Sequence, residues 1–195
     1  MTKILFESSI FLHQKVGGIS KYIVKVNERL KKYNIDSKIV SAITINDNLT
    51  KKNSNNVYFF KLSKIPKFCR KFFFFINDFF FLFYVKIFKP DLVHFSYYNI
   101  KLISKLKVPY IITIHDLIHE KYNLNDKQFP KNKLLDNAKH IICVSNETKK
   151  DLIDKYSIDQ RKISIVYQGV DNQNSYIEKK DFFILYVGDR KGYKN

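Results

Sequence analysis

Short apolar runs alternate with helical patterns along most of this chain, and that alternation constrains the fold more than any other feature. Strands are predicted at residues 3–6, 37–44, 57–60, 91–95, 110–114, 140–144 and 162–167. Most of these runs are apolar throughout, which is typical of strands covered on both faces of a parallel sheet. Because helical segments separate them, the sequence predicts a doubly wound, Rossmann-like α/β fold.

The helical segments have their own signals. After the glycine pair at 17–18, apolar residues recur at helical spacing and predict a buried face that comprises Ile19, Tyr22, Ile23, Val26 and Leu30. A Phe-rich helix is predicted over 72–88, with Pro66 suited to its first turn. Two further helices are expected, one over 100–106 and one after Ser145, which is suited to an N-cap.

The length of the chain, 195 residues, suggests one domain and part of a second. Residues 168–181 are polar and weakly periodic, as in a linker, and 182–187 form a new predicted strand. A single strand cannot bury both of its faces. We therefore expect one complete domain over 1–167, a linker over 168–181 and the first strand of a second domain within 182–195.

Positive charge is concentrated ahead of the Phe-rich helix. The chain carries 35 Lys and Arg against 18 Asp and Glu, a formal net charge of +17. Residues 51–71 hold seven bases and no acid, and ten Phe lie from Phe68 to Phe88. This arrangement suits an anionic membrane surface, where each basic residue is worth about 1 kcal/mol. The alternative is a buried helix with a solvated basic lead-in, because Phe is usually a core residue.

A membrane span is not favoured, because the run 72–88 contains Asp78 and Lys86, each of which costs roughly 2.5–3.5 kcal/mol near the bilayer centre. The first residues do not resemble a signal peptide, and two cysteines fit a reducing compartment. We expect a cytoplasmic protein that is peripheral on the inner face of the cell membrane. Nucleic acid is a less favoured partner, because the bases are not interleaved with stacking aromatics in an RNA-binding motif.

Candidate site residues lie in the loops that follow the strands, because ligands of open α/β sheets bind beyond the carboxyl ends of the strands. Gly17 and Gly18 lie between the first strand and the first predicted helix, where backbone N–H groups can approach an anion. No G-x-G-x-x-G pattern is present, so a dinucleotide cofactor is not supported. A tight turn that serves only the backbone is the alternative.

His115 and Asp116 follow another predicted strand. An imidazole there can donate a hydrogen bond to a substrate hydroxyl or accept a proton, whereas in the alternative Asp116 caps a turn and His115 is incidental. His119 stands at metal-ligand spacing from His115, but no third ligand supports a zinc site. Arg190 and Lys194 follow the last predicted strand, where they either hold a diphosphate or form a solvated pair.

Six segments stand in a fairly specific order and spacing: GGISKY (17–22), DLVH (91–94), TIHDL (113–117), VSNETKKDL (144–152), IVYQGVD (165–171) and YVGDRKGYKN (186–195). Together they resemble family 4 of the retaining glycosyltransferases, which build bacterial surface polysaccharides. TIHDL and the terminal segment look most like the mannosyltransferase-type branch. The resemblance implies two facing Rossmann-like domains of the GT-B type, in which the first domain binds the acceptor and the second binds the nucleotide sugar.

The resemblance also implies roles for individual residues. Backbone N–H groups of Gly17 and Gly18 would contact a phosphate, His115 would contact the transferred sugar, and Arg190 with Lys194 would neutralise the departing diphosphate. The acceptor-side candidates are Asp116 and Ser145. Many such enzymes need no metal, because basic side chains stabilise the leaving group, and no cofactor is expected. The predicted partners are a nucleotide sugar, a lipid-linked or glycan acceptor and an anionic membrane surface.

One departure from the family is large. The family holds the donor with two glutamates separated by seven residues in the second domain, and no two of the five glutamates here have that spacing. We therefore expect a chain truncated at the start of the donor domain, which binds the acceptor but is inactive alone. The second hypothesis is a non-catalytic basic module that binds membrane surfaces, and the third is a nucleic-acid binder.

Overall fold

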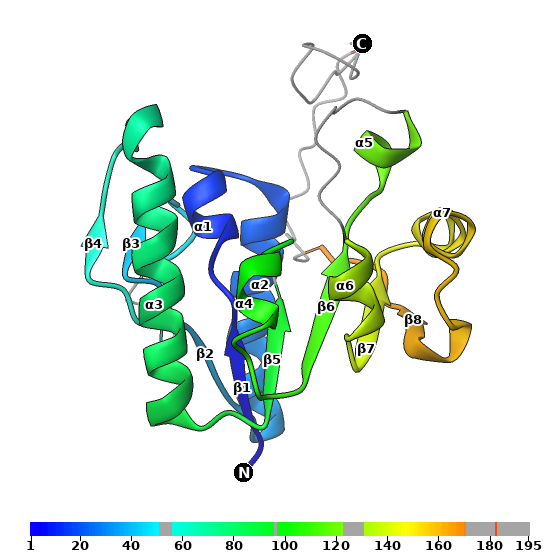
Figure 1. The fold of residues 1–195 in the computed structure, drawn as a ribbon, viewed down its shortest axis with the longest axis horizontal. Coiled ribbons are helices and arrows are strands. Elements are labelled where there is room, and N and C mark those ends of the chain that lie inside the picture. Colours follow the sequence, from blue (N-terminus) through cyan, green and yellow to red (C-terminus); the bar gives the residue numbers. More distant parts are fainter. Residues whose placement is uncertain (51–55, 96, 123–130, 171–181, 183–195) are drawn as a thin grey trace.

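A computed structural model describes residues 1–50, 56–95, 97–122, 131–170 and 182 (Figure 1). Its centre is a six-stranded sheet in the order β2-β1-β5-β6-β7-β8, in which every pairing is parallel. The strands are β1 (Lys3–Phe6), β2 (Asp36–Ile39), β5 (Leu92–Phe95), β6 (Tyr110–Ile114), β7 (His140–Cys143) and β8 (Ile163–Ile165). The predicted Rossmann-like fold class is confirmed.

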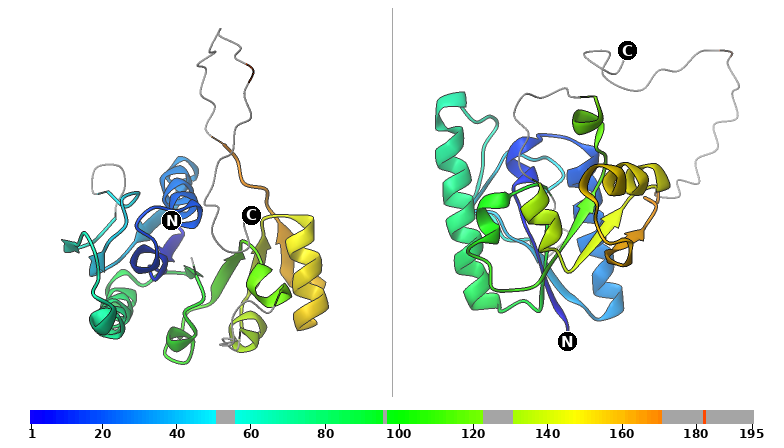
Figure 2. Two further views of the ribbon diagram at one scale, coloured as in Figure 1. Left: turned by 90° about the horizontal axis from the view of Figure 1, so that it is seen from above. Right: turned by 45° about the vertical axis from the view of Figure 1, so that its right-hand side comes forward.

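Helices cover the two faces of this sheet unequally. Seen from above in Figure 2, α2 lies on one face, whereas α3, α4 and α6 lie on the other. The helices are α1 (Ile10–His13), α2 (Gly18–Leu30), α3 (Arg70–Phe88), α4 (Ile100–Ile103), α5 (Ile118–Lys121), α6 (Asn132–Asp136) and α7 (Asn146–Tyr156), with 3-10 turns η1 (Lys31–Tyr33), η2 (Lys67–Cys69) and η3 (Gln160–Lys162). The chain leaves β1 toward β2 and returns on the other side at β5, so the topological switch point lies between β1 and β5.

The main core lies on the face that α3, α4 and α6 cover. Each of these helices, and α7 as well, contributes a side chain to it: Phe81, Leu102, Leu134 and Leu152, all at most 1% exposed. Burial of such a side chain stabilises the fold by about 1.5–3 kcal/mol. This packing holds α4 and α6 in place, because helices of four or five residues are not stable alone.

Helix α2 forms as its apolar spacing predicts. Ile23 and Val24 are buried against Phe6 of β1 and Ile39 of β2. The other members of the predicted apolar face pack, partly buried, against the same cluster. Because α2 connects β1 to β2, this packing fixes the loop before α2 at the carboxyl edge of the sheet.

The Phe-rich helix is confirmed as α3, although Pro66 precedes η2 and lies outside its first turn. The buried residues of α3 are Asn77, Phe81 and Phe88. The side chain of Asn77 accepts a hydrogen bond from the backbone N–H of Ile43 (2.8 Å) and donates to the Ile43 carbonyl oxygen (2.9 Å). The helix is therefore attached through a polar contact as well as through Phe.

The prediction of one strand over 37–44 is wrong in its second half. The strand β2 ends at Ile39, and β3 (Ile43–Thr44) pairs with β4 (Phe60–Lys61) in a separate two-stranded sheet. The contact of Asn77 with Ile43 explains the departure, because it holds this segment against α3. The strand predicted over 57–60 is correspondingly displaced, and Val57 forms only an isolated bridge with Val40.

Other differences concern short elements. Helix α1, between β1 and the glycine pair, is not predicted, because four residues are too few to show a helical period. The predicted elements over 100–106 and 162–167 form but are shorter, as α4 and β8. The strand predicted over 182–187 lies outside the described residues, except for Phe182, so the division into domains stays a prediction.

Candidate functional site

Segments from four parts of the chain meet around one imidazole at the carboxyl edge of the sheet. His115 directly follows β6, and its Nδ1 lies 2.9 Å from the amide nitrogen of Gln168, which follows β8. The hydroxyl of Thr148 in α7 donates to the His115 carbonyl oxygen at 3.4 Å. The ring of Tyr22 from α2 meets the imidazole edge-on, with centroids 5.3 Å apart. We call this edge the His115 rim.

The Nε2 atom of His115 is buried and forms no hydrogen bond with any described residue. Burial lowers the pKa of His115 to about 4, although the neighbouring Asp116 acts in the opposite direction. The ring is therefore neutral at pH 7. Because the amide of Gln168 donates to Nδ1, the ring proton lies on Nε2. A buried N–H group without an acceptor costs about 1–3 kcal/mol, so this atom suits an oxygen of a ligand.

Neither glycine of the pair needs glycine for its backbone conformation. Gly17 has φ −175° and ψ 160°, which is extended backbone, and Gly18 begins α2 without a positive φ. A turn that serves only the backbone therefore does not explain the pair. A Cβ on Gly18 would meet nothing within 4 Å, whereas a Cβ on Gly17 would lie 2.1 Å from Oε1 of Gln14. The backbone at Gly18 is open to close approach.

The glycine pair and His115 lie at the same edge of the sheet. Tyr22 stands four residues after Gly18 in α2, a rise of about 6 Å along the helix, and it contacts His115. The structure thus brings together residues that are almost a hundred positions apart in the sequence. Arg190 and Lys194 lie outside the described residues, so their predicted place beside this rim stays a prediction.

The two acceptor-side candidates lie at the same rim in different settings. Asp116 is exposed, and its Oδ1 accepts a hydrogen bond from the N–H of Ile118 at 3.3 Å, as the turn-capping alternative predicts. Ser145 caps α7 by accepting from the N–H of Thr148 at 3.1 Å, which confirms the predicted N-cap. Since Thr148 also holds the His115 carbonyl, Ser145 helps to position the rim.

The sequence patterns miss several residues of this rim. Tyr22 is predicted only as a core residue of α2, and Gln168 lies in a segment that supports the family resemblance without standing out chemically. Lys131 is 7% exposed, pairs with Glu120, and lies over the ring of Tyr98 with Nζ 3.6 Å from the centroid. Burial lowers the pKa of Lys131 to about 8, against the attraction of Asp116. No local signal distinguishes it from the other bases of this chain.

No metal centre is found in the part of the chain that the structure describes, where no three His, Cys, Asp or Glu side chains gather as ligands. His119, which stands at metal-ligand spacing from His115 in the sequence, lies on α5 and is exposed.

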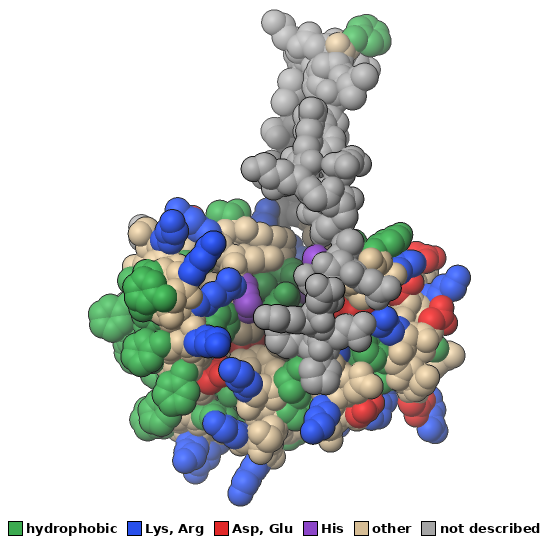
Figure 3. All heavy atoms as spheres, turned by 45° about the horizontal axis from the view of Figure 1, so that its top comes forward, with side chains coloured by type: hydrophobic (Ala, Val, Ile, Leu, Met, Phe, Trp, Pro, Cys, Tyr) green, Lys and Arg blue, Asp and Glu red, His purple; other side chains and the backbone are tan. Residues whose placement is uncertain are grey.

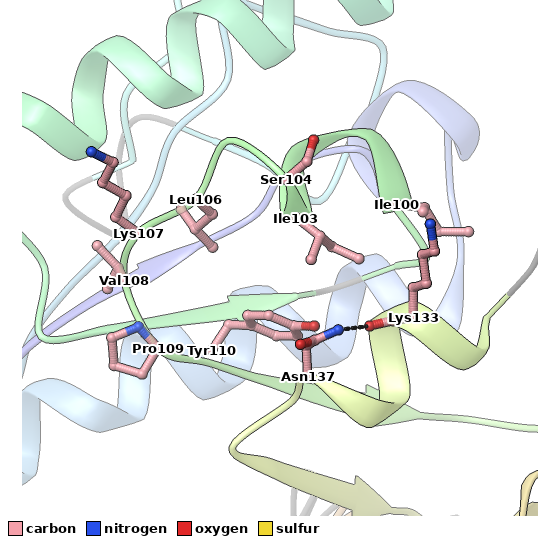
Figure 4. A pocket seen from close by; sticks show the side chains of 10 residues that line it. All are labelled: Ile100, Ile103, Ser104, Leu106, Lys107, Val108, Pro109, Tyr110, Lys133 and Asn137. Carbon is pink, nitrogen blue, oxygen red and sulfur yellow. Dashed lines mark hydrogen bonds between the residues drawn. The ribbon is translucent and has the colours of Figure 1, made fainter.

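A pocket of about 630 Å³ lies away from the His115 rim (Figure 4). Its lining includes Val108, Pro109 and Tyr110, which lead into the start of β6, together with Ile103 of α4 and Lys133 of α6. Because His115 follows the end of the same strand, the pocket and the rim occupy opposite edges of the sheet. The pocket is therefore not part of the candidate site.

The outer side of α3 is apolar. We call it the Phe face, and its members are between 51% and 67% exposed: Phe72, Phe75, Phe79, Phe83 and Ile87. Figure 3 shows hydrophobic side chains gathered on the side where α3 lies, with Lys and Arg side chains around them. Within the described residues, no helix is both long enough and apolar enough to cross a membrane.

Comparison with protein families gives one match that covers most of the chain. The model described as Glycosyltransferase Family 4 matches residues 16–174. No curated protein matches the chain at a significant level.

Solved structures similar to this chain share its fold at low sequence identity. A glycosyltransferase from Rickettsia africae is 21% identical with a TM-score of 0.55, over 87% of this chain and 44% of its own. The sucrose-phosphate synthase of Thermosynechococcus elongatus is 14% identical with a TM-score of 0.61, over 88% and 49%. Anabaena HepE in complex with UDP and glucose is 12% identical with a TM-score of 0.53, over 88% and 45%. The chain thus spans about half the length of these proteins.

Proposed function

This chain belongs to glycosyltransferase family 4, and from that premise we propose that residues 1–167 form the acceptor-binding half of a glycosyltransferase. The reaction moves a hexose such as mannose from a nucleotide sugar to a lipid-linked or polysaccharide acceptor in surface-glycan synthesis. In this proposal, residues 168–181 link this half to a donor-binding domain that begins within 182–195. UDP and glucose bound to the structurally similar HepE support a nucleotide sugar as donor.

The single observation that carries the proposal is the buried Nε2 of His115, which has no hydrogen-bond partner among the described residues. This neutral imidazole holds a buried N–H donor that has no acceptor among the described residues. The ring is held in place by the segment after β8, by α7 and by α2. A hydroxyl of the transferred sugar is a suitable acceptor for it. Such a preorganised donor stabilises a reacting sugar without reorganising when charge develops.

The remaining candidates surround this contact. The open backbone at Gly18 admits a phosphate oxygen, and Arg190 with Lys194 neutralises the departing diphosphate. Asp116 is exposed at the rim and faces the acceptor side. With basic side chains stabilising the leaving group, the transfer proceeds with retention of configuration and without a metal ion.

Two histidines of the same chain test this function in one spectrum. UDP-glucose and GDP-mannose are titrated into the chain labelled with 15N, and the ring signals of His115 and His140 are followed. His140 is the first residue of β7 and lies at the opposite edge of the sheet, where its ring forms a hydrogen bond with Ser164 of β8. It serves as the internal control. Because most donor contacts belong to the second domain, each nucleotide sugar is added in large excess, so that weak contact of its sugar with His115 can be detected. We expect at least one nucleotide sugar to shift the His115 signals and leave those of His140 in place. Equal shifts of both, or none of either, contradict the proposal.

A transfer assay tests the expectation that this chain is inactive alone. Radiolabelled UDP-glucose and GDP-mannose are incubated with the chain and membrane vesicles that contain lipid-linked glycans. We expect no incorporation above the protein-free control, because many transition-state contacts belong to the donor domain. Incorporation by the 195-residue chain contradicts the half-site assignment.

A second candidate function, binding to an anionic membrane surface, is favoured by the Phe face. Monomeric proteins rarely expose large contiguous apolar patches unless something binds there. Exposed bases lie at the start of α3 and in the segment before it, including Lys64, Lys67 and Lys71. Apolar rings beside positive charge match the interface of a bilayer with anionic headgroups. Such contact places the acceptor-binding half on the inner face of the cell membrane, and it is also consistent with a module that has no catalytic role.

Vesicle sedimentation tests the membrane contact. The variant Phe75→Ser/Phe79→Ser is compared with the parent chain on phosphatidylglycerol vesicles, and Tyr33→Ser is the control because Tyr33 is 75% exposed beyond the end of α2. We expect the double variant to bind at least tenfold more weakly and the control to bind normally. Binding of the parent should weaken as salt is raised. If the double variant binds the vesicles as the parent does, membrane contact through this face is contradicted. The same holds if the parent chain is a dimer in solution and the double variant is a monomer, because the Phe face is then a contact between two copies.

A further inference from the structure

A cluster of four side chains stands apart from the His115 rim. The guanidinium of Arg70 lies 2.8 Å from Nδ1 of His13 and also covers the ring of Phe74. The imidazole of His13 is packed between two aromatic rings, with centroids 4.7 Å from Phe74 and 4.9 Å from Tyr97. These residues come from α1, from α3 and from the segment after β5. We call them the Arg70 cluster.

The topology of the sheet places this cluster where a ligand is expected. His13 lies in the connection that follows β1, and Tyr97 lies in the connection that follows β5. These two strands are neighbours, and their connections leave in opposite directions. Ligands of open α/β sheets bind in the crevice that such a switch point creates at the carboxyl ends of the strands.

The chemistry of the cluster suits a phosphate. Burial of the imidazole lowers the pKa of His13 to about 4, and the charge of Arg70 adds to the shift, so the ring is neutral at pH 7. Nδ1 then accepts from Arg70, which leaves the proton on Nε2 as a further donor. A guanidinium uses only one of its five N–H groups in this contact. The others form a fork that matches phosphate oxygens.

Tyr97 connects the cluster to the His115 rim. Its pKa is raised, first by burial and then by the charge of Asp116, and lowered by Arg70, so its hydroxyl lies within electrostatic reach of both charged groups. The ring of Tyr97 also packs against Tyr98, whose hydroxyl is 3.4 Å from the Asp116 carbonyl oxygen. On its other side, the cluster includes Arg70 and Phe74 of α3, the helix that carries the Phe face.

From this placement we propose that Arg70 and His13 bind the phosphate that joins the acceptor sugar to its lipid carrier. The lipid chain then lies toward the Phe face, the phosphate on the Arg70 cluster, and the sugar along Tyr97 toward His115. This inference rests on the proposed transferase function and names the chemical class of its acceptor, a sugar joined through phosphate to a lipid.

Binding of geranyl diphosphate, a short lipid diphosphate, tests the proposal on the complete chain. Its dissociation constant is measured by calorimetry, and the His13 ring signals are followed by NMR. We expect binding with shifts at His13, and at least tenfold weaker binding by Arg70→Gln. Lys71→Gln is the matched control, because it removes the same charge from the next residue of α3, which is also exposed. Equal weakening by both variants shows attraction by general charge and overturns the proposal.

Two further arms distinguish the sources of the phosphate. Inorganic pyrophosphate should bind at least tenfold more weakly than geranyl diphosphate, and equal affinity overturns the lipid part of the proposal. Arg70→Gln and Lys71→Gln should bind phosphatidylglycerol vesicles with equal affinity. If only Arg70→Gln loses vesicle binding, the cluster binds ordinary lipid headgroups and the proposal is overturned. Arg70 is exposed, so the melting temperature of Arg70→Gln should equal that of the parent.

The two histidine reporters separate the failure of this inference from failure of the transferase function. A response of His115 to nucleotide sugars without any response of His13 to geranyl diphosphate overturns the inference alone. A response of His13 that depends on Arg70, without a response of His115, supports the lipid-phosphate site and overturns the transfer role of His115.

Discussion

The two long helices of this molecule, α2 and α3, both bury a mixture of apolar and polar side chains, but they expose opposite kinds of surface. α2 buries Ile23 and Val24 together with two polar residues, and it exposes charged side chains such as Lys21 and Arg29. α3 buries Asn77 along with Phe81 and Phe88, and exposes Phe at several turns. Both helices flank the same sheet, so the difference does not arise from their position in the fold.

The difference shows which parts of each helix serve stability and which serve binding. A fold needs the apolar stripe of α2 and has no use for exposed rings, because a ring left in water contributes no burial. The side of α3 that faces the sheet provides enough packing to hold it. Its outer side is therefore available for a partner, and the following predictions test this division.

The largest effect is expected from truncating the core stripe of α2. Ile23→Ala should lower the free energy of unfolding by about 2–5 kcal/mol, because Ile23 is 0% exposed and the change leaves a cavity. Phe79→Ala removes a larger side chain from α3, but Phe79 is 67% exposed, so the change should be within about 0.5 kcal/mol. Urea unfolding followed by circular dichroism measures both. Similar losses for the two variants would show that the Phe face is part of the core.

A pH-dependent effect is expected at the second polar attachment of α3. Asn99 donates to Glu7 after β1 (3.2 Å) and to Asp78 of α3 (2.7 Å). Burial raises the pKa of Glu7 to about 7, although hydrogen bonds from Asn99 and Ser9 oppose the shift. The folded chain then holds more protons than the unfolded chain between pH 4.5 and 7. Stability from this group is present below that window and falls as the pH rises through it.

Glu7→Gln should remove the fall in stability that the Glu7 carboxyl causes as the pH rises. Relative to the parent, the variant should gain about 3 kcal/mol of unfolding free energy as the pH rises from 4.5 to 8, at roughly 1.4 kcal/mol per pH unit. The lowered pKa values of His13, His94 and His115 act in the opposite direction in both proteins and cancel in the difference. Glu28→Gln on α2, which breaks only a pair with Lys25 at 3.8 Å, is the control. A difference that does not change with pH would contradict the assignment.

Each helix also carries one buried asparagine, which compares their polar attachments. Asn77→Ala should cost about 1–3 kcal/mol, because the buried N–H of Ile43 loses its partner and the Ile43 carbonyl keeps only the hydroxyl of Ser41. Asn27→Ala should cost less, because its Nδ2 bonds one side chain, that of Asn56, and its Oδ1 has no hydrogen bond. Urea midpoints of the two variants give the order. A larger loss at Asn27 would reverse the comparison.

The same contrast explains how far the sequence could predict this molecule. The strands that pair in the main sheet and the helix α2 are specified by local patterns, so they were predictable. The strand predicted over 37–44 failed because a side chain of α3, Asn77, redirects the backbone at Ile43. A pattern along the chain does not show which polar groups will meet across such a distance.

Prediction of the candidate site has the same limit. His115 and the glycine pair could be proposed because each follows a predicted strand, and the rule for carboxyl ends needs only the order of elements. Gln168, which fixes the proton of His115, lies 53 residues away and has no motif of its own. The Arg70 cluster likewise joins α1, α3 and the segment after β5, and only the fold brings these together.

The smallest effect is expected at the first residue of α2. Gly18→Ala should raise the free energy of unfolding by about 0.5–1 kcal/mol, since Gly18 has no positive φ and its added Cβ meets nothing within 4 Å. Gly17→Ala should not stabilise, because the side chain of Gln14 must first move away. If Gly18 serves a phosphate, the more stable variant should also lose the shift of His115 by nucleotide sugars. In that case glycine at position 18 lowers the stability of α2 but permits binding, just as the outer side of α3 presents apolar side chains for a partner. If the shift of the His115 signals is unchanged in Gly18→Ala, α2 contributes to the fold alone.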